Sequence, residues 1–117
     1  NDEESITMKT KTGVELIAEE RARHSTVEGW TPAHDDKHRR RQLAKAAHSY
    51  LATHAEPDVD HPRSPALMRS CWDWPWAKKW WKPSNDPVRN LVKAGALIAA
   101  EIDRLNRAAA MQKGVRG

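Results

Sequence analysis

The 117-residue chain contains no phenylalanine, one tyrosine and one cysteine. The lone Cys71 excludes a disulfide within the chain and a metal site made of several cysteines, and we expect it to be a small buried apolar residue. No apolar run approaches the ~20 residues of a membrane-spanning helix, and there is no signal-peptide pattern. We therefore expect a cytoplasmic protein with no membrane partner.

Long runs of one charge are also scarce. The chain carries 20 lysines and arginines against 16 aspartates and glutamates, for a net charge of +4. Its basic runs are Arg39 to Arg41 and Lys78 to Lys79, whereas nucleic-acid binders usually carry denser basic stretches. A small anionic ligand fits this balance at least as well as nucleic acid, which we do not expect as the partner.

Tryptophan is the residue that the chain has in excess. Five of the six tryptophans lie between Trp72 and Trp81, with lysines among and directly after them. An indole ring beside an ammonium group suits a planar anion, because the ring stacks and the ammonium meets the charge. The alternative is that these rings plug the open side of a small helical core. So many rings in one short stretch favour binding.

Helical periodicity predicts a mainly α fold of three longer helices, with the Trp- and Pro-rich loop packed over them. Thr12 begins the first helix in a capping box that a glutamate three residues later completes, and Gly29 ends it. The second helix is predicted over residues 37–53, capped by Asp35 or Asp36. Its apolar stripe comprises Leu43, Ala46, Ala47, Tyr50 and Leu51.

The third helix has the clearest signal. Asp86 is a predicted N-cap and Pro87 occupies the first helical position. Gly95 inside the helix indicates that another backbone approaches there, and the neighbouring alanines support close packing. The apolar stripe expected to face the core comprises Val88, Leu91, Val92, Gly95, Ile98, Ala99, Ile102 and Leu105.

The predicted organisation is a flexible arm at 1–11, a single helical domain at 12–107 and a frayed tail at 108–117. A Pro-rich loop over 55–70 continues into the Trp stretch, with a possible short helix at 65–70. Connections of that length are typical of functional loops, local disorder or an unrecognised element.

Two catalytic interpretations are alternatives to simple binding. His34 and His38 lie four residues apart on a predicted helix, so with Asp35 they are weak candidates for metal ligands. The same His-Asp pair is found in HD-type phosphohydrolases, but the further histidines and aspartates of that class have no convincing place here. The alternative interpretation is a capped helix start with the histidines in polar contacts.

The second catalytic interpretation is a MazG-like nucleotide pyrophosphohydrolase. Those enzymes hold magnesium with paired acids on facing helices. Here Glu20 is followed by Arg23 and His24 rather than by a third acid. Glu101 and Asp103 are two residues apart, so they do not share a helix face. The chain departs from the pattern at both motifs.

Binding without turnover is the interpretation we favour. The Trp stretch leads into the helix start at Asp86, whose free N–H groups are suited to anions. We expect Trp72 or Trp80 to be structural, and we expect no cofactor. The predicted ligand-binding residues are the stacking rings Trp30, Trp74, Trp76 and Trp81, the turn residue Thr31, and the phosphate partners Lys82, Arg89 and Lys93.

Part of the chain resembles ryanodine-receptor-type (RyR) domains. Residues 16–36, with a helix that ends in Gly-Trp-Thr before an acidic turn, resemble the first half of that family. His61-Pro62 and Pro75-Trp76 resemble its His-Pro and Pro-aromatic segments, and residues 86–102 resemble its closing helix. The helix over 42–55 has no counterpart there. The chain is also similar to small phage and prophage proteins.

This resemblance implies a nucleotide-recognition fold in an infected bacterial host. The expected role is sequestration of a signalling nucleotide as a phage counter-defence, in a homo-oligomer that the Ala-rich helix faces suggest. One alternative is a protein–protein inhibitor of a host defence nuclease, in which exposed tryptophans would anchor the interface. The MazG-like or HD-like phosphohydrolase is the other.

Overall fold

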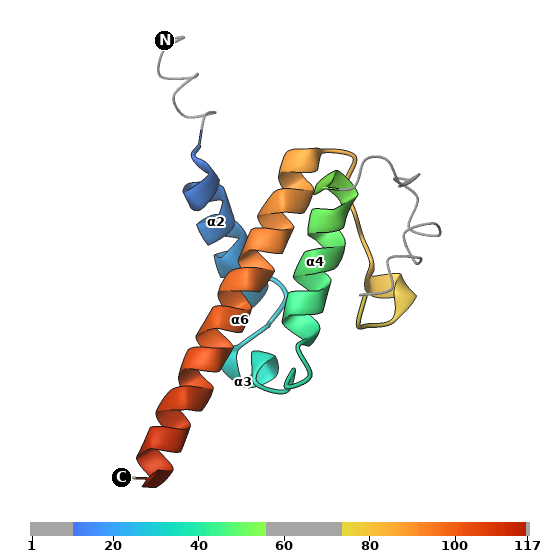
Figure 1. The fold of residues 1–117 in the computed structure, drawn as a ribbon. Coiled ribbons are helices and arrows are strands. Elements are labelled where there is room, and N and C mark those ends of the chain that lie inside the picture. The colour runs from blue at the N-terminus through green and yellow to red at the C-terminus, as the bar shows by residue number, and fades with distance from the viewer. Residues whose placement is uncertain (1–10, 56–73, 117) are drawn as a thin grey trace.

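The computed structural model describes residues 11–55 and 74–116, and every regular element within them is helical. The elements in chain order are α2 (Gly13–Thr26), α3 (Pro32–Asp35), α4 (Gln42–Ala55), the 3-10 turn η1 (Lys78–Trp80) and α6 (Pro87–Arg116). Figure 1 shows α2 and α4 packed along the first half of α6, with the rest of α6 extending beyond them. The predicted mainly α fold with three longer helices is confirmed. None of the described helices is apolar over enough of its length to cross a membrane.

Local hydrogen bonds set two of the helix starts where the sequence predicted them. The Thr12 hydroxyl accepts a hydrogen bond from the Glu15 backbone N–H at 3.2 Å, and the Glu15 carboxylate accepts from the Thr12 N–H at 3.0 Å. The Asp86 carboxylate accepts from the Val88 N–H at 3.0 Å, with Pro87 between them. Each contact satisfies a backbone donor that has no partner inside its helix.

The second helix begins later than predicted. Residues 37–41 are not helical, because Arg41 takes a left-handed backbone with φ 64° and α4 starts only after it. The short helix α3 precedes this turn, and Thr31 caps it by accepting from the His34 N–H at 3.2 Å. Asp35 is therefore not a cap. Its side chain is buried and lies 3.3 Å from Arg21 Nη2 on α2.

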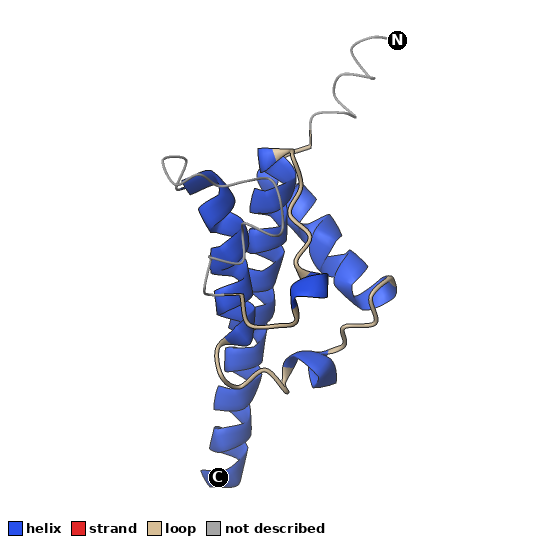
Figure 2. Ribbon diagram, turned by 90° about the vertical axis from the view of Figure 1, so that its right-hand side faces the viewer, coloured by secondary structure: helices blue, strands red, loops and turns tan. Residues whose placement is uncertain are grey.

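The core lies mainly between α4 and α6, and small side chains let the two helices approach closely. Four of the five predicted stripe residues of α4 are buried, but Leu51 is 39% exposed. Residues 74–86, which we call the Trp loop, pass in front of α4 in Figure 2, and the ring of Trp81 packs from this loop into the core. The cluster comprises Leu43, Ala46, Ala47, Tyr50, Ala52, Trp81, Ala94, Leu97 and Ala100.

Helix α6 differs from its prediction in two ways. It continues to Arg116, so residues 108–116 form helix where the sequence predicted a frayed tail. Large side chains at four positions of the predicted core stripe are also about half exposed, whereas Val92 of that stripe is buried together with alanines and Leu97. Hydrophobic periodicity identified the helix but predicted only part of its buried face. The exposed stripe residues are Val88, Ile98, Ile102 and Leu105.

Gly95 provides the close approach between α2 and α6. A Cβ built on Gly95 would lie 2.5 Å from Cδ1 and 2.8 Å from Cγ1 of Ile17. Both distances are well inside van der Waals contact. The glycine predicted to mark a close approach does so, although its neighbour is a side chain rather than a backbone.

Gly95→Ala is expected to lower the free energy of unfolding by about 1–3 kcal/mol, because overpacking outweighs the gain of about 1 kcal/mol in helix propensity. In an Ile17→Ala background the clash is gone, so the same substitution should stabilise the protein by up to about 1 kcal/mol. Urea unfolding of the four proteins measures both values. Equal effects in the two backgrounds would contradict this packing.

Several predictions fall on residues that the structure does not describe. These are most of the arm at 1–11, the possible short helix at 65–70, the His61-Pro62 segment, Cys71 and Trp72, and they stay predictions.

Candidate functional site

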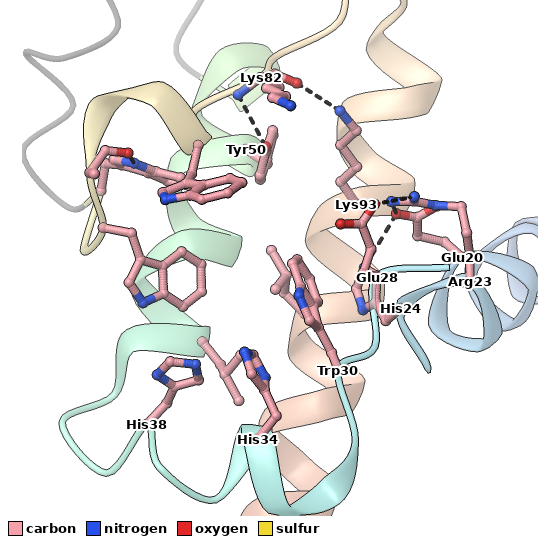
Figure 3. A pocket seen from close by; sticks show the side chains of 16 residues that line it. Glu20, Arg23, His24, Glu28, Trp30, His34, His38, Tyr50, Lys82 and Lys93 are labelled. Carbon is pink, nitrogen blue, oxygen red and sulfur yellow. Dashed lines mark hydrogen bonds and ion pairs between the residues drawn. The ribbon is translucent and has the colours of Figure 1, made fainter. Parts of the chain in front are cut away.

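A cavity of about 560 Å³ lies beside the core, between the end of α2, the α3 turn, α4, α6 and the Trp loop. Figure 3 shows its side chains converging from these separate segments. Its lining residues are Glu20, Arg23, His24, Glu28, Trp30, His34, His38, Leu43, Tyr50, Trp74, Trp76, Ala77, Trp80, Lys82, Lys93 and Leu97.

Aromatic rings form a continuous arc around this cavity. Trp30 stacks parallel to His34, with ring centroids 5.7 Å apart and an interplanar angle of 3°. The arc continues through His34 to His38 at 5.2 Å and from His38 to Trp76 at 5.1 Å. Trp76 then meets Trp74 edge-on at 5.4 Å. Rings held by other rings in this way present fixed faces to a flat ligand.

Two ammonium groups lie at the end of the cavity that Tyr50 closes. Lys93 Nζ lies 5.3 Å from the Tyr50 ring centroid and donates to the Lys82 carbonyl oxygen at 2.6 Å. The Tyr50 hydroxyl in turn accepts from the Lys82 N–H at 3.4 Å. Within residues 11–55 and 74–116, neither lysine ion-pairs with a carboxylate. Burial and the nearby Arg89 lower the pKa of Lys93, and a bound anion would offset that effect.

The acids near this end of the cavity are already neutralised. Glu20 is 3% exposed, and its carboxylate accepts from Arg23 at 2.8 and 2.9 Å and lies 2.8 Å from Arg89 Nη1. Glu28 accepts from the same Arg23 at 2.8 Å. Burial acts to raise the pKa of Glu20, but the hydrogen bonds and charges of the two arginines outweigh it and bring that pKa to about 2. Burial also lowers the pKa of His24, whose Nε2 lies 3.3 Å from Glu20.

The low pKa of Glu20 predicts a loss of stability in acid. A carboxyl with a lowered folded pKa stabilises the protein above its usual pKa of 4.5, and this contribution disappears as the pH falls from 4.5 to about 2. Glu20→Gln should be less stable at pH 7 by about 1–3 kcal/mol, and its difference from the wild type should shrink over that window.

Urea unfolding between pH 2.5 and 7 measures this difference directly. Glu19→Gln is the matched control, because Glu19 is exposed and contacts Lys11 at the surface. A Glu20→Gln difference that is constant with pH would contradict the ion-pair account.

Two adjacent tryptophans have opposite roles. Trp81 is 4% exposed and packs on Tyr50 and Trp74 at 4.7 and 4.9 Å, so it is a core residue. Trp80 is 55% exposed at the cavity edge, between the ammonium groups of Lys79 and Lys82. Trp81, which was predicted to stack on a ligand, is therefore part of the core, and the expectation that Trp72 or Trp80 is structural stays a prediction. Trp72 lies outside the described residues.

The cavity brings together most, but not all, of the predicted binding residues. Those that line it are Trp30, Trp74, Trp76, Lys82 and Lys93. Three do not line it, because each has a local structural role: Thr31 caps α3, Trp81 fills the core and Arg89 pairs with Glu20.

Sequence reasoning missed other residues that line the cavity. Tyr50 was assigned to the core stripe alone, and His24 and Glu28 were treated as part of the first helix. His34 and His38, considered as metal ligands, are members of the aromatic arc instead. Composition alone could have pointed to these residues. With no phenylalanine in the chain, the one tyrosine and the six histidines are the rings that remain besides the tryptophans.

Neither catalytic arrangement is assembled in the described part of the chain. No three His, Cys, Asp or Glu side chains there converge as metal ligands. His34 Nδ1 lies 3.3 Å from Asp35, but that carboxylate is also paired with Arg21. Glu101 is buried and accepts from Arg104 at 2.6 Å, so it does not face Glu20 across a magnesium site.

Comparison with protein-family models, curated proteins and solved structures found no match to this chain, so the resemblance to RyR-type domains stays a prediction from the sequence.

Proposed function

We propose that this protein binds a small nucleotide-derived anion in the ring-lined cavity without turning it over. The observation that carries the proposal is the placement of Lys82 and Lys93, without carboxylate partners among the described residues, beside a cavity walled by aromatic rings. A base would stack on the rings and the phosphates would meet the ammonium groups. The volume of about 560 Å³ is within the range of small-ligand pockets.

Binding without turnover accounts better for the acids than catalysis does. The hydrogen bonds and charges of Arg23 and Arg89 outweigh burial and bring the pKa of Glu20 to about 2, so Glu20 stays charged rather than acting as a base ready to take a proton. Glu28 also accepts a hydrogen bond from Arg23. None of the described residues lining the cavity is a serine, threonine or cysteine. Sequestration of a signalling nucleotide, as a phage counter-defence, is the role we propose from the sequence resemblance.

A thermal-shift screen tests this proposal. Cyclic dinucleotides and ADP-ribose derivatives are compared with matching nucleosides and with inorganic phosphate. We expect a nucleotide to raise the melting temperature more than its nucleoside or phosphate alone, because only the nucleotide uses both halves of the cavity. The bound compound is then recovered after denaturation. Intact compound supports a binder, altered compound indicates an enzyme, and the absence of any shift contradicts the proposal.

Trp80 favours a second candidate, a protein–protein inhibitor. Its ring is 55% exposed and flanked by the ammonium groups of Lys79 and Lys82. An exposed tryptophan among cations is a suitable anchor for an acidic protein surface. Trp80→Ala would then abolish capture of the partner, and it should reduce any nucleotide-induced thermal shift less than Trp30→Ala does, because Trp80 lies only at the cavity edge.

A further inference from the structure

Helix α6 carries an apolar stripe outside the cavity and outside the core. We define the α6 stripe as Ile98, Ile102, Leu105 and Ala109, which follow one another at spacings of four, three and four residues. The first three are 47%, 52% and 52% exposed, and Ala109 is also exposed. Ile98 and Leu105 are seven residues apart, as are Ile102 and Ala109, and a seven-residue repeat is the one by which one helix packs along another.

The other two faces of α6 are already covered by the chain itself. Leu97 belongs to the core cluster with residues of α4, so that face is buried. A second face meets α2, where Gly95 lies against Ile17 and Asp103 lies 3.4 Å from Arg21. The α6 stripe is the third face, and no described residue buries its large side chains.

The end of α6 also lacks support within a single chain. Figures 1 and 2 both show the helix extending past α2, α3 and α4. The residues from Ala108 to Lys113 are all exposed. This segment extends a helix that is already formed, so it needs no new nucleus, but without a packing partner only helix propensity holds it against fraying. The repeat continues into this segment, so one packing partner would cover both the stripe and the unsupported end.

We propose that the α6 stripe pairs with the same stripe of a second copy of this chain, forming a two-fold dimer. The charges beside the stripe favour this partner. Asp103 on one flank is paired with Arg21, and Glu101 on the other is paired with Arg104. Two copies of this stripe can therefore meet without repulsion between like charges. An acidic or basic partner would instead need unpaired charges beside the stripe to bind.

The dimer is expected to be of moderate strength. The stripe from Ile98 to Ala109 spans 11 residues of helix, or about 17 Å at the usual rise. A contact of that length is small for a protein interface, so we expect a dissociation constant of about 1–100 µM. This proposal does not depend on the cavity or its ligand.

Sedimentation equilibrium of the full chain between about 1 and 300 µM tests it. Ile102→Glu places two carboxylates in the paired stripe and should weaken the dimer by roughly a hundredfold. Met111→Glu is the matched control. Met111 is 74% exposed and lies about two and a half turns further along α6, on the opposite side, so this variant should dimerise like the wild type.

Leu105→Gln serves as a second stripe variant in case Ile102→Glu does not fold, which circular dichroism reports. Three results would overturn the proposal: a wild type that stays monomeric at every concentration, a dimer that both stripe variants leave intact, or a dimer that Met111→Glu weakens equally. None of these results bears on nucleotide binding, which the thermal-shift screen measures separately.

Discussion

Trp81→Ala is expected to lower the free energy of unfolding by about 3–5 kcal/mol. Trp81 is almost fully buried, and its ring packs against both Tyr50 and Trp74 between the Trp loop and α4. Removing it opens a cavity and also removes the support for Trp74, which lines the ligand cavity. For a small domain this loss is a large share of the total stability. Urea unfolding followed by circular dichroism measures it.

The neighbouring residue is the matched control. Trp80→Ala removes the same side chain from an exposed position, so we expect a change within about 0.5 kcal/mol. Trp81→Phe is a second control. No described residue accepts a hydrogen bond from the buried Trp81 Nε1, so a phenylalanine loses volume but no hydrogen bond and should cost less than about 1.5 kcal/mol. Equal losses for Trp80→Ala and Trp81→Ala would show that the assignment of the two rings is wrong.

Substitutions at Trp30 and Lys93 are expected to weaken nucleotide binding by about tenfold to a hundredfold each, for different reasons. Trp30→Ala removes an aromatic ring from the cavity wall, so it should weaken a nucleotide and its nucleoside alike. Lys93→Gln removes a charge but keeps a donor for the Lys82 carbonyl, so it should weaken only the nucleotide. Isothermal titration with the compound that gives the largest thermal shift, and with its nucleoside, separates the two effects.

Lys113→Gln is the control for overall charge. Lys113 is exposed near the end of α6, far along the helix from Lys93, and the substitution changes the net charge by the same amount. We expect it to leave the nucleotide affinity within about twofold at physiological salt. If Lys113→Gln weakens binding as much as Lys93→Gln does, the attraction is diffuse and the cavity is not the site.

The apolar stripe of α6 shows how periodicity can mislead. Its large residues were predicted to face the core, because a helix in a small domain usually buries its most apolar face. In this chain alanines and Leu97 face α4, which lets the two helices pack closely, and Val92 is the one large residue of the predicted stripe that is buried. The exposed large residues are left on the outer face, where the dimer proposal accounts for them.

The sequence by itself determined the features that depend on neighbours three or four residues away. Thr12 and Asp86 cap their helices as predicted, because a cap is a hydrogen bond to the next turn of the same segment. The concentration of tryptophans and lysines is also apparent from the sequence, and it identified five of the residues that line the cavity.

Only the tertiary structure decided which rings and charges belong to the cavity. Trp80 and Trp81 are adjacent residues of the same type, so the sequence does not distinguish them. The path of the loop over α4 exposes Trp80 and buries Trp81 in the core. Arg89 pairs with Glu20 because α2 packs against α6, so Arg89 does not line the cavity. The position of α2 also places His24 in the cavity wall. Such assignments depend on contacts between segments distant in the chain, and neither composition nor spacing along the chain encodes those contacts locally.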